Sequence, residues 1–346
     1  METMNVLPYT PSNDRARQPG TRGLSSWRLS MRPVPIFILA LLTPLILLTG
    51  LAVGPADAGE VGSAGMLFLR TGIDARSAGM GETGVAGATD ASAVYWNPAL
   101  LALAPGTQVG LQHMEMYDLF RMESVFASHA TPYGNFGLLL TGFYSDEVER
   151  TELDRVGEVL GTFQPYDLVG GLSWGKAFGT VMVGATAKVL YERIDAYSGT
   201  AFAMDLGIAH DSAIEGLRLG AAVQHLGSEL TLNEEATKLP TALRAGVLWN
   251  PQLDSAAWAR RIDFSGEFLA PNDGSPHIHG GVEFELERRF VIRGGYRGNY
   301  DTWGETFGAG FRNEHLAVDY AWQGNQNDFD PTHRISIRFD FEHLAP

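Results

Sequence analysis

Apolar and polar side chains alternate one by one along most of the chain after about residue 105. The pattern is clearest in residues 334–341, which read RISIRFDF, and it recurs in residues 181–191, 202–208, 278–286 and 316–322. Successive side chains of a β-strand point to opposite faces, so each stretch predicts a strand with one apolar face. The pattern therefore predicts an all-β protein.

Fourteen segments of this kind can be delimited. Each has about ten residues or more, the length that a tilted strand needs to cross a bilayer, whereas strands of globular proteins average about five or six. An even number of long antiparallel strands predicts a transmembrane β-barrel. The predicted strands are 106–117, 120–131, 134–145, 165–178, 181–194, 198–211, 216–227, 239–250, 260–271, 276–287, 289–299, 304–313, 314–323 and 332–341.

A secreted β-sandwich or propeller is the alternative, because its strands also have one apolar face. Its polar face would meet solvent and carry many Lys and Glu residues. Here the polar positions are mainly Gly, Ala and Ser with isolated charges, which favours the crowded lumen of a barrel. Barrels also place aromatic residues at both membrane interfaces, and such residues recur near the predicted strand ends: Tyr117, Tyr144, Trp174, Tyr191, Trp249, Tyr296 and Trp322.

The connections between the predicted strands differ in length. Short turns, such as residues 131–134, alternate with longer loops at 146–164, 228–238, 251–259 and 324–331. Outer-membrane barrels have short turns at the periplasmic end and longer loops at the outer end. We therefore expect the four long loops at one end of the barrel.

Composition narrows the class of protein further. The 346 residues include 41 Gly, and only 19% are charged; the mean hydropathy is −0.05. Alternating lipid-facing and lumen-facing residues cancel in such an average. The net charge of −15 argues against a nucleic-acid partner, which needs a basic face. The absence of cysteine excludes disulfides and thiolate sites, and no motif indicates a cofactor.

The first 58 residues read as an export leader. Arginines precede an apolar run at residues 34–53, and Ala56-Asp57-Ala58 follows it. A basic region, an apolar run and an Ala-x-Ala site are typical of a secretory signal peptide, so we expect cleavage after Ala58. An uncleaved anchor helix is the alternative, and either Met1 or Met31 could be the start. The leader and the barrel together predict the outer membrane of a Gram-negative-type bacterium.

Residues 59–104 break the alternation, and we expect them to form a plug ahead of a barrel at 105–346. A fourteen-stranded barrel has a lumen on the order of 10–15 Å across, which would leak if it were empty. A compact segment rich in Gly and Ala could fill it. A disordered linker is the alternative, but the segment has apolar residues that need packing partners: Met66, Leu67, Phe68, Leu69, Val94, Tyr95, Trp96 and Leu100.

Particular residues have expected roles in this plug. Gly79 and Gly81 would let its backbone approach the wall closely, and Asp90 would cap a short helical turn. Asn97 and Pro98 would fix a turn. Tyr95 and Trp96 would wedge the plug against the wall. Charged residues expected to face the lumen are Asp205, Arg244, Glu283, Glu285, Arg293, Arg334 and Arg338.

Two motifs in this segment resemble a known family. Ala78-Gly79-Met80-Gly81 and residues 90–99, which read DASAVYWNPA, resemble the N-terminal signature of the PorV/PorQ family, outer-membrane proteins associated with type IX secretion. Residues 332–336 (THRIS) also resemble family members. The family is similar to the long-chain fatty acid transporter (FadL-like) barrels, which have fourteen strands and an N-terminal hatch with a related Asn-Pro-Ala motif. One departure is that five residues follow Phe341, the final aromatic residue.

The resemblance implies two functions. The first is an accessory or shuttle role in protein secretion and surface attachment, with a translocon and cargo signal domains as partners. The alternative is FadL-like transport of a hydrophobic ligand. A hydrophobic carrier needs an apolar channel, and the many inward charges favour the secretion role. The sequence does not identify the cargo or ligand, show whether the plug moves, or give the oligomeric state. With either function, outer-membrane lipid is expected to surround the barrel.

An enzyme is the third class of function, and the sequence does not favour it. The pairs His277 with His279, His210 with Asp211, and Asp330 with His333 could serve catalysis or metal binding. None has a third ligand at a defined spacing, and no strained G-x-S-x-G turn is present. Residues 79–84 read G-x-G-x-x-G but lack the flanking strand and helix of a dinucleotide site. We therefore expect no catalytic site and no metal.

Overall fold

The structure is a computed structural model that describes residues 62–151, 158–251, 259, 261–287, 289–325 and 330–341. The predicted leader, its cleavage site after Ala58 and the five residues after Phe341 lie outside these ranges.

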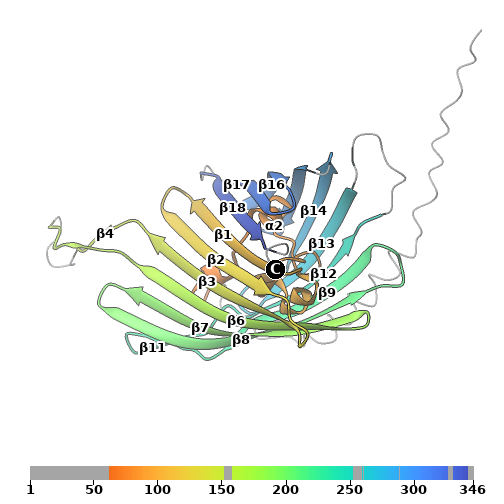
Figure 1. Ribbon diagram of the computed structural model, residues 1–346. Helices are drawn as coiled ribbons and strands as arrows, with labels where there is room; N and C mark the ends of the chain where they lie inside the picture. The colour runs from red at the N-terminus through yellow and green to blue at the C-terminus, as the bar shows by residue number, and fades with distance from the viewer. Residues whose placement is uncertain are drawn as a thin grey trace, which may run out of the picture. The chain divides into compact units, whose positions relative to one another are not determined.

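Fourteen antiparallel strands form a closed barrel (Figure 1), which confirms the predicted fold class. The barrel closes where the first strand pairs with the last, from Gln108 opposite Asp340 to Glu115 opposite His333. In chain order the wall strands are β1 (Thr107–Met116), β2 (Phe120–His129), β3 (Asn135–Ser145), β6 (Tyr166–Phe178), β7 (Val181–Ile194), β8 (Tyr197–Asp211), β9 (Leu217–Gly227), β12 (Ala242–Trp249), β13 (Arg261–Pro271), β14 (His277–Leu286), β15 (Phe290–Gly298), β16 (Trp303–Arg312), β17 (Leu316–Asn325) and β18 (Thr332–Asp340).

The alternation in the sequence separates the two faces of this wall. On β8, Phe202 is 66% exposed on the outer face, whereas Ala203 and Asp205 are buried on the inner face. The same division holds on β18, where Ile335 faces outward and Arg334 is buried inside. Apolar side chains on the outer face are what a surrounding bilayer requires.

Two of the long connections contain hairpins that alternation did not reveal. Strands β4 (Val148–Glu149) and β5 (Thr162–Phe163) pair within the β3–β6 connection, and β10 (Leu230–Leu232) and β11 (Glu235–Thr237) pair within the β9–β12 connection. Both hairpins lie at the same end of the barrel, which we call the loop end. The opposite end, where β1 begins and β18 ends, is the turn end.

One prediction about the connections is wrong. Residues 251–259 were expected at the same end as the other long loops. Because neighbouring strands are antiparallel, however, β12 ends and β13 begins at the turn end. The other three long loops share the loop end. Loop length does not reveal the end at which a loop lies, whereas the direction of the strand before it does.

Residues 62–104, which we call the luminal segment, run through the barrel from the loop end to the turn end. At the loop end, Gly62 N–H donates to the carbonyl of Asp273 in the β13–β14 connection. At the turn end, Asn135 Nδ2 donates to the carbonyls of Leu101 and Ala104. The segment contains η1 (Leu67–Arg70), α2 (Ala75–Gly79, enclosed by strands in Figure 1), α3 (Ala93–Trp96) and η2 (Pro98–Leu103).

Side-chain caps explain where two of these short helices, α2 and η2, begin. The Asp74 carboxylate accepts from Ser77 N at 2.7 Å and caps α2. Asn97 caps η2 by accepting from Ala99 N, and Pro98 occupies the first turn, where a missing N–H costs nothing. Asp90 precedes α3 and accepts from Ser92 N at 2.9 Å. No helix in the described ranges is long and apolar enough to cross a membrane.

Candidate functional site

Glycines bring the luminal segment into backbone contact with β14, β15 and β16. A methyl group built on Gly81 would lie 2.6 Å from the carbonyl oxygen of Gly280, and Gly81 also has a φ of 74°. A methyl group on Gly79 would lie 3.0 Å from the Cα atom of Gly308. Both positions therefore exclude larger residues, Gly81 on conformational as well as steric grounds.

Trp96 lies at the centre of the luminal segment and is fully buried. Its indole Nε1 donates to Asp74 Oδ2 at 2.6 Å, and methyl groups built on Gly72 or Gly84 would collide with its ring. The Arg244 guanidinium lies 5.0 Å from the ring centre. Trp96 therefore joins three parts of the segment to one another as well as to the wall.

Tyr95 and Asn97 make further contacts on either side of Trp96. The Tyr95 hydroxyl donates to the Leu69 carbonyl at 3.0 Å within the segment. Asn97 Nδ2 donates to the carbonyls of Val85 at 2.8 Å and Ile208 at 3.1 Å, so that it links the segment to β8. Pro98 lies against Gly184 of β7, where a methyl group would be 2.3 Å from the Pro98 carbonyl carbon.

Buried and partly buried ion pairs attach the luminal segment to one side of the lumen. Glu82 pairs with Arg334 at 2.8 Å, and Arg76 pairs with Glu283 at 3.0 Å. Asp90 pairs with Arg338. Burial by itself would raise the pKa of Glu82, but the guanidinium of Arg334, with those of Arg297 and Arg244, lowers it to about 2. Glu82 is therefore ionised near neutral pH.

The predicted lumen residues fall into two groups. Arg244, Glu283, Arg293, Arg334 and Arg338, together with Glu285 at the edge, lie on strands β12 to β18 and take part in ion pairs there. Asp205 lies apart from them on β8. The inner faces of β2, β3, β6 and β7 carry mostly apolar and hydroxyl side chains, among them Phe120, Met122, Ser124, Leu139, Thr141, Phe143, Val169 and Leu190.

This division corrects the expectation that lumen charges disfavour a hydrophobic ligand. The charges are neutralised against one another and against the luminal segment, and those exposed to an open space line a cleft at the turn end, among them Glu283 and Arg338. Glu267 shows the neutralisation: it pairs with Arg244 at 2.5 Å and also accepts from the backbone N–H groups of Gly84 and Val85. The other side of the lumen is mainly apolar; its charged residues are the Lys188–Asp205 pair, and Asp167 and Glu192 at the loop end.

A column of aromatic rings lies on this apolar side near the loop end. Phe68 of the luminal segment stacks on Phe143 of β3, with ring centres 5.0 Å apart and planes 5° apart. Phe143 in turn stacks on Phe120 of β2, with centres 5.5 Å apart. Offset stacking of this kind adds about 0.5–1.5 kcal/mol per pair to simple burial.

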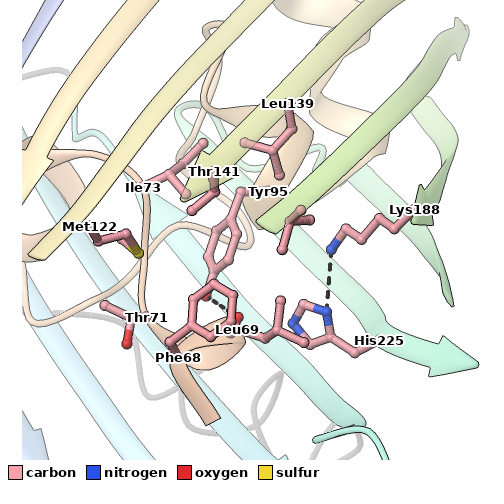
Figure 2. Close-up of a pocket in the computed structure, with 11 residues that line it drawn as sticks. Phe68, Leu69, Thr71, Ile73, Tyr95, Met122, Leu139, Thr141, Lys188 and His225 are labelled. Carbon is pink, nitrogen blue, oxygen red and sulfur yellow. Dashed lines mark hydrogen bonds between the residues drawn. The ribbon is translucent and has the colours of Figure 1, made fainter. Parts of the chain in front are cut away.

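An inner cavity lies on the turn-end side of this column, and Figure 2 shows the residues that line it. Its volume of about 10 Å³ leaves room for one water molecule at most. Its lining is mainly apolar: Phe68, Leu69, Ile73, Tyr95, Met122, Leu139 and Val169, with Thr71, Thr141, Lys188 and His225. Figure 2 shows Lys188 and His225 side by side at one edge, with Lys188 Nζ 3.3 Å from His225 Nδ1.

A larger mouth cleft opens at the loop end, with a volume of about 420 Å³. Phe120, Phe143 and Tyr166 contribute its aromatic lining, and Asp167 and Glu192 lie beside them. Phe143 lines the mouth cleft, and its stacking partner Phe68 lines the inner cavity. The Phe68–Phe143 pair therefore separates the two spaces.

Sequence reasoning missed two partners of Asp205. Lys188 Nζ lies 2.5 Å from Asp205 Oδ2, and the backbone N–H of His225 donates to Asp205 Oδ1 at 2.8 Å. His225 adopts a left-handed φ of 58° where the β8–β9 register shifts. The one available signal was Asp205 itself, a lone carboxylate in an apolar strand.

The histidines considered for catalysis have packing roles in the structure. The His277 ring stacks on Tyr300, with centres 3.8 Å apart. His279 contacts the Glu82 carbonyl through Nδ1 and the Tyr300 hydroxyl through Nε2. Within the described ranges, no group of three or more His, Cys, Asp or Glu residues could hold a metal ion.

Comparisons with known proteins identify the fold. No family model matches the chain, and no curated protein matches it in sequence. Solved structures do match. The toluene transporter TbuX of Ralstonia pickettii has a TM-score of 0.56 and 14% identity, over 79% of this chain and 99% of TbuX. The monoaromatic hydrocarbon channel TodX, as a ΔS2S3 mutant, has a TM-score of 0.54 and 12% identity, over 78% of this chain and 98% of TodX.

A ΔS2 mutant of TodX matches with a TM-score of 0.50 and 12% identity, over 77% of this chain and 96% of that one. At these identities the likeness concerns the fold alone. The chain therefore shares its barrel fold with TbuX, described as a toluene transporter, and with TodX, described as a monoaromatic hydrocarbon channel. The closed barrel with these neighbours places the protein in the outer membrane of a Gram-negative-type bacterium.

Proposed function

We propose that this protein carries small hydrophobic molecules across the outer membrane. The molecule would enter the mouth cleft at the loop end, pass the Phe68–Phe143 pair and reach the inner cavity. The observation that carries the proposal is the position of that pair, because it is the shared wall between a cleft of about 420 Å³ and an apolar cavity. Clefts with mainly apolar walls and a few polar groups are the usual sites for small ligands.

Passage requires the luminal segment to move, because the inner cavity holds one water molecule at most. The segment is attached to β14 and β18 by ion pairs, of which Glu82–Arg334 is fully buried, and breaking a buried pair leaves costly unpaired charges. Its contacts with β2, β3, β6 and β7 are mainly apolar. An apolar ligand can replace apolar contacts, so the Phe68 side of the segment is the side expected to open.

The comparisons support this function over a role in secretion. TbuX is described as a toluene transporter and TodX as a monoaromatic hydrocarbon channel, and both share the fold. The motif that resembles the PorV/PorQ family lies inside the barrel, where Trp96, Asn97 and Ala99 are fully buried. Its role there is packing, so the motif does not bear on whether the outer surface binds a secretion partner.

Uptake by whole cells tests the proposal. Gram-negative cells that produce the protein, and cells with the empty vector, would be given radiolabelled toluene at low concentration. Labelled glycerol serves as a hydrophilic control for leakage. Faster toluene entry with unchanged glycerol entry is expected. Equal toluene entry in both cell types, or a parallel rise in both solutes, would contradict the proposal. Copurification of a large translocon with the protein, without any effect on toluene uptake, would favour the secretion role.

A further inference from the structure

The electrostatic character of the mouth cleft indicates which hydrophobic molecules it accepts. Four of the described residues that line the cleft have carboxyl side chains. None of its described lining residues is Lys, Arg or His. Asp146 pairs with Arg121 at the rim. Asp167 and Glu192 lie deeper, on the inner faces of β6 and β7, where each is partly buried.

These two carboxylates continue the row that contains the aromatic column. Asp167 lies directly opposite Phe143 on one side and directly opposite Glu192 on the other. Side chains in directly opposed positions have Cβ atoms about 4.5–5.5 Å apart, and like charges placed so destabilise a sheet. The row therefore presents an aromatic ring followed by two adjacent carboxyl groups.

The side chains of Asp167 and Glu192 have no ion-pair or hydrogen-bond partner within the part of the chain that the structure describes. Other inward-facing carboxylates of the wall differ. Glu267 pairs with Arg244, and Glu283 with Arg293, both within 2.6 Å. Asp319 pairs with Arg293 at 2.7 Å. Adjacent inward carboxyl groups without a basic partner are therefore a local feature of this cleft.

The inner cavity offers no excess positive charge to an incoming anion. Lys188 is its one basic lining residue apart from His225, and Asp205 neutralises it at 2.5 Å. His225 is almost fully buried, and its ring already contacts Lys188 through Nδ1 and the backbone of Leu69. A carboxylate would meet repulsion at the mouth and no compensation inside.

We propose that the preferred substrates are amphiphilic organic cations, in which an apolar or aromatic body carries one ammonium group. This inference rests on the proposed function. The apolar body would lie against Phe120 and Phe143, and the ammonium group would lie between the Asp167 and Glu192 carboxylates. An ammonium group near an aromatic face gains attraction of its own. Fatty acid anions of the same size are excluded by charge.

Three ligands that share one skeleton test the inference: 4-phenylbutylamine, 4-phenylbutanol and 4-phenylbutanoate. Their affinities for the detergent-solubilised full-length protein would be measured by calorimetry. We expect the amine to bind at least about tenfold more tightly than the butanoate, with the alcohol between them. Asp167→Asn with Glu192→Gln should reduce this preference to below about threefold and leave the affinity for the alcohol unchanged.

The control is Glu305→Gln, which neutralises an exposed carboxylate on β16. It should retain the full preference for the amine. Equal affinities for all three ligands, or a preference for the butanoate, would overturn the inference and leave the proposed function standing. No binding of any of the three would overturn both. Heat-modified migration on gels shows whether each variant barrel is folded, and a Glu192→Gln single variant replaces the double variant if the latter does not fold.

Discussion

The ring of Phe68, in the luminal segment, lies parallel to the ring of Phe143 on the wall, with the two centres 5.0 Å apart. Phe68 should act as the removable half of this pair, because it belongs to the segment that must move. Phe68→Ala should therefore increase the initial rate of toluene uptake several-fold in whole cells. It should also lower stability by about 3–5 kcal/mol, the usual cost of truncating a buried aromatic residue.

The matched control is Phe136→Ala, which removes a lipid-facing aromatic side chain from β3. Uptake by this variant should equal that of the unaltered protein. Phe68→Ala with unchanged uptake would show that the aromatic pair does not control passage.

The close approach at Gly81 predicts a second effect. Alanine at this position would adopt an unfavourable φ, at about 1–3 kcal/mol, and would collide with the Gly280 carbonyl. Gly81→Ala should therefore displace the luminal segment and raise single-channel conductance in planar bilayers. Gly266→Ala is the control, since a methyl group there meets no atom within 4 Å; its conductance should be that of the unaltered protein.

Trp96 and Asn97 hold the segment in place from within. Trp96→Ala should lower the stability of the barrel by about 3–5 kcal/mol, and Asn97→Ala by about 1–3 kcal/mol, because two backbone carbonyls lose their donor. Both variants should increase conductance and lower the thermal midpoint. Trp249→Ala removes a Trp that faces lipid on β12 and should leave conductance unchanged. If Trp96→Ala and Asn97→Ala both had the conductance of the unaltered protein, this would contradict the view that residues 62–104 close the lumen.

The ion pair between Glu82 and Arg334 predicts a pH dependence. The pKa of Glu82 falls from 4.5 to about 2 in the folded protein. A carboxyl group with a lowered pKa stabilises the fold above its ordinary pKa, and this contribution is lost as the pH falls from 4.5 towards 2. The thermal midpoint should therefore decline, and conductance should rise, across this window.

Glu82→Gln isolates the contribution of this pair. The variant should be less stable at pH 7, because Arg334 is left buried without its ion-pair partner. Its thermal midpoint should then fall less steeply with acid than that of the unaltered protein. Glu305→Gln should decline in acid as steeply as the unaltered protein. An identical acid response in Glu82→Gln would show that the pair does not fasten the segment.

Alternation predicted the wall because a barrel strand has two chemically different faces along its whole length. Strands such as β18 could be delimited to within one residue from this pattern alone. The small hairpins β4–β5 and β10–β11 have too few residues to show a period. The end to which residues 251–259 belong depends on strand direction, which loop length does not reveal.

The candidate site was less predictable than the wall. Phe68 was recognised only as an apolar residue that needs a partner, because its stacking on Phe143 joins positions far apart in sequence. The inward charges were identified, but their pairing with Glu82, Arg76 and Asp90 was not. Because of that pairing, the inward charges no longer argue against a hydrophobic ligand. They are neutralised on one side of the lumen, and the other side is available to an apolar ligand.

The most direct test of the account is photoaffinity labelling with an apolar aromatic diazirine, followed by mass spectrometry of the labelled peptides. Passage along the aromatic column predicts labels on residues 66–73, 119–122 and 139–145, and competition by excess toluene should remove them. Labels confined to outward-facing residues such as Phe136, Leu172 and Phe202, unaffected by toluene, would contradict the account, because the probe would then have met the barrel only from the lipid.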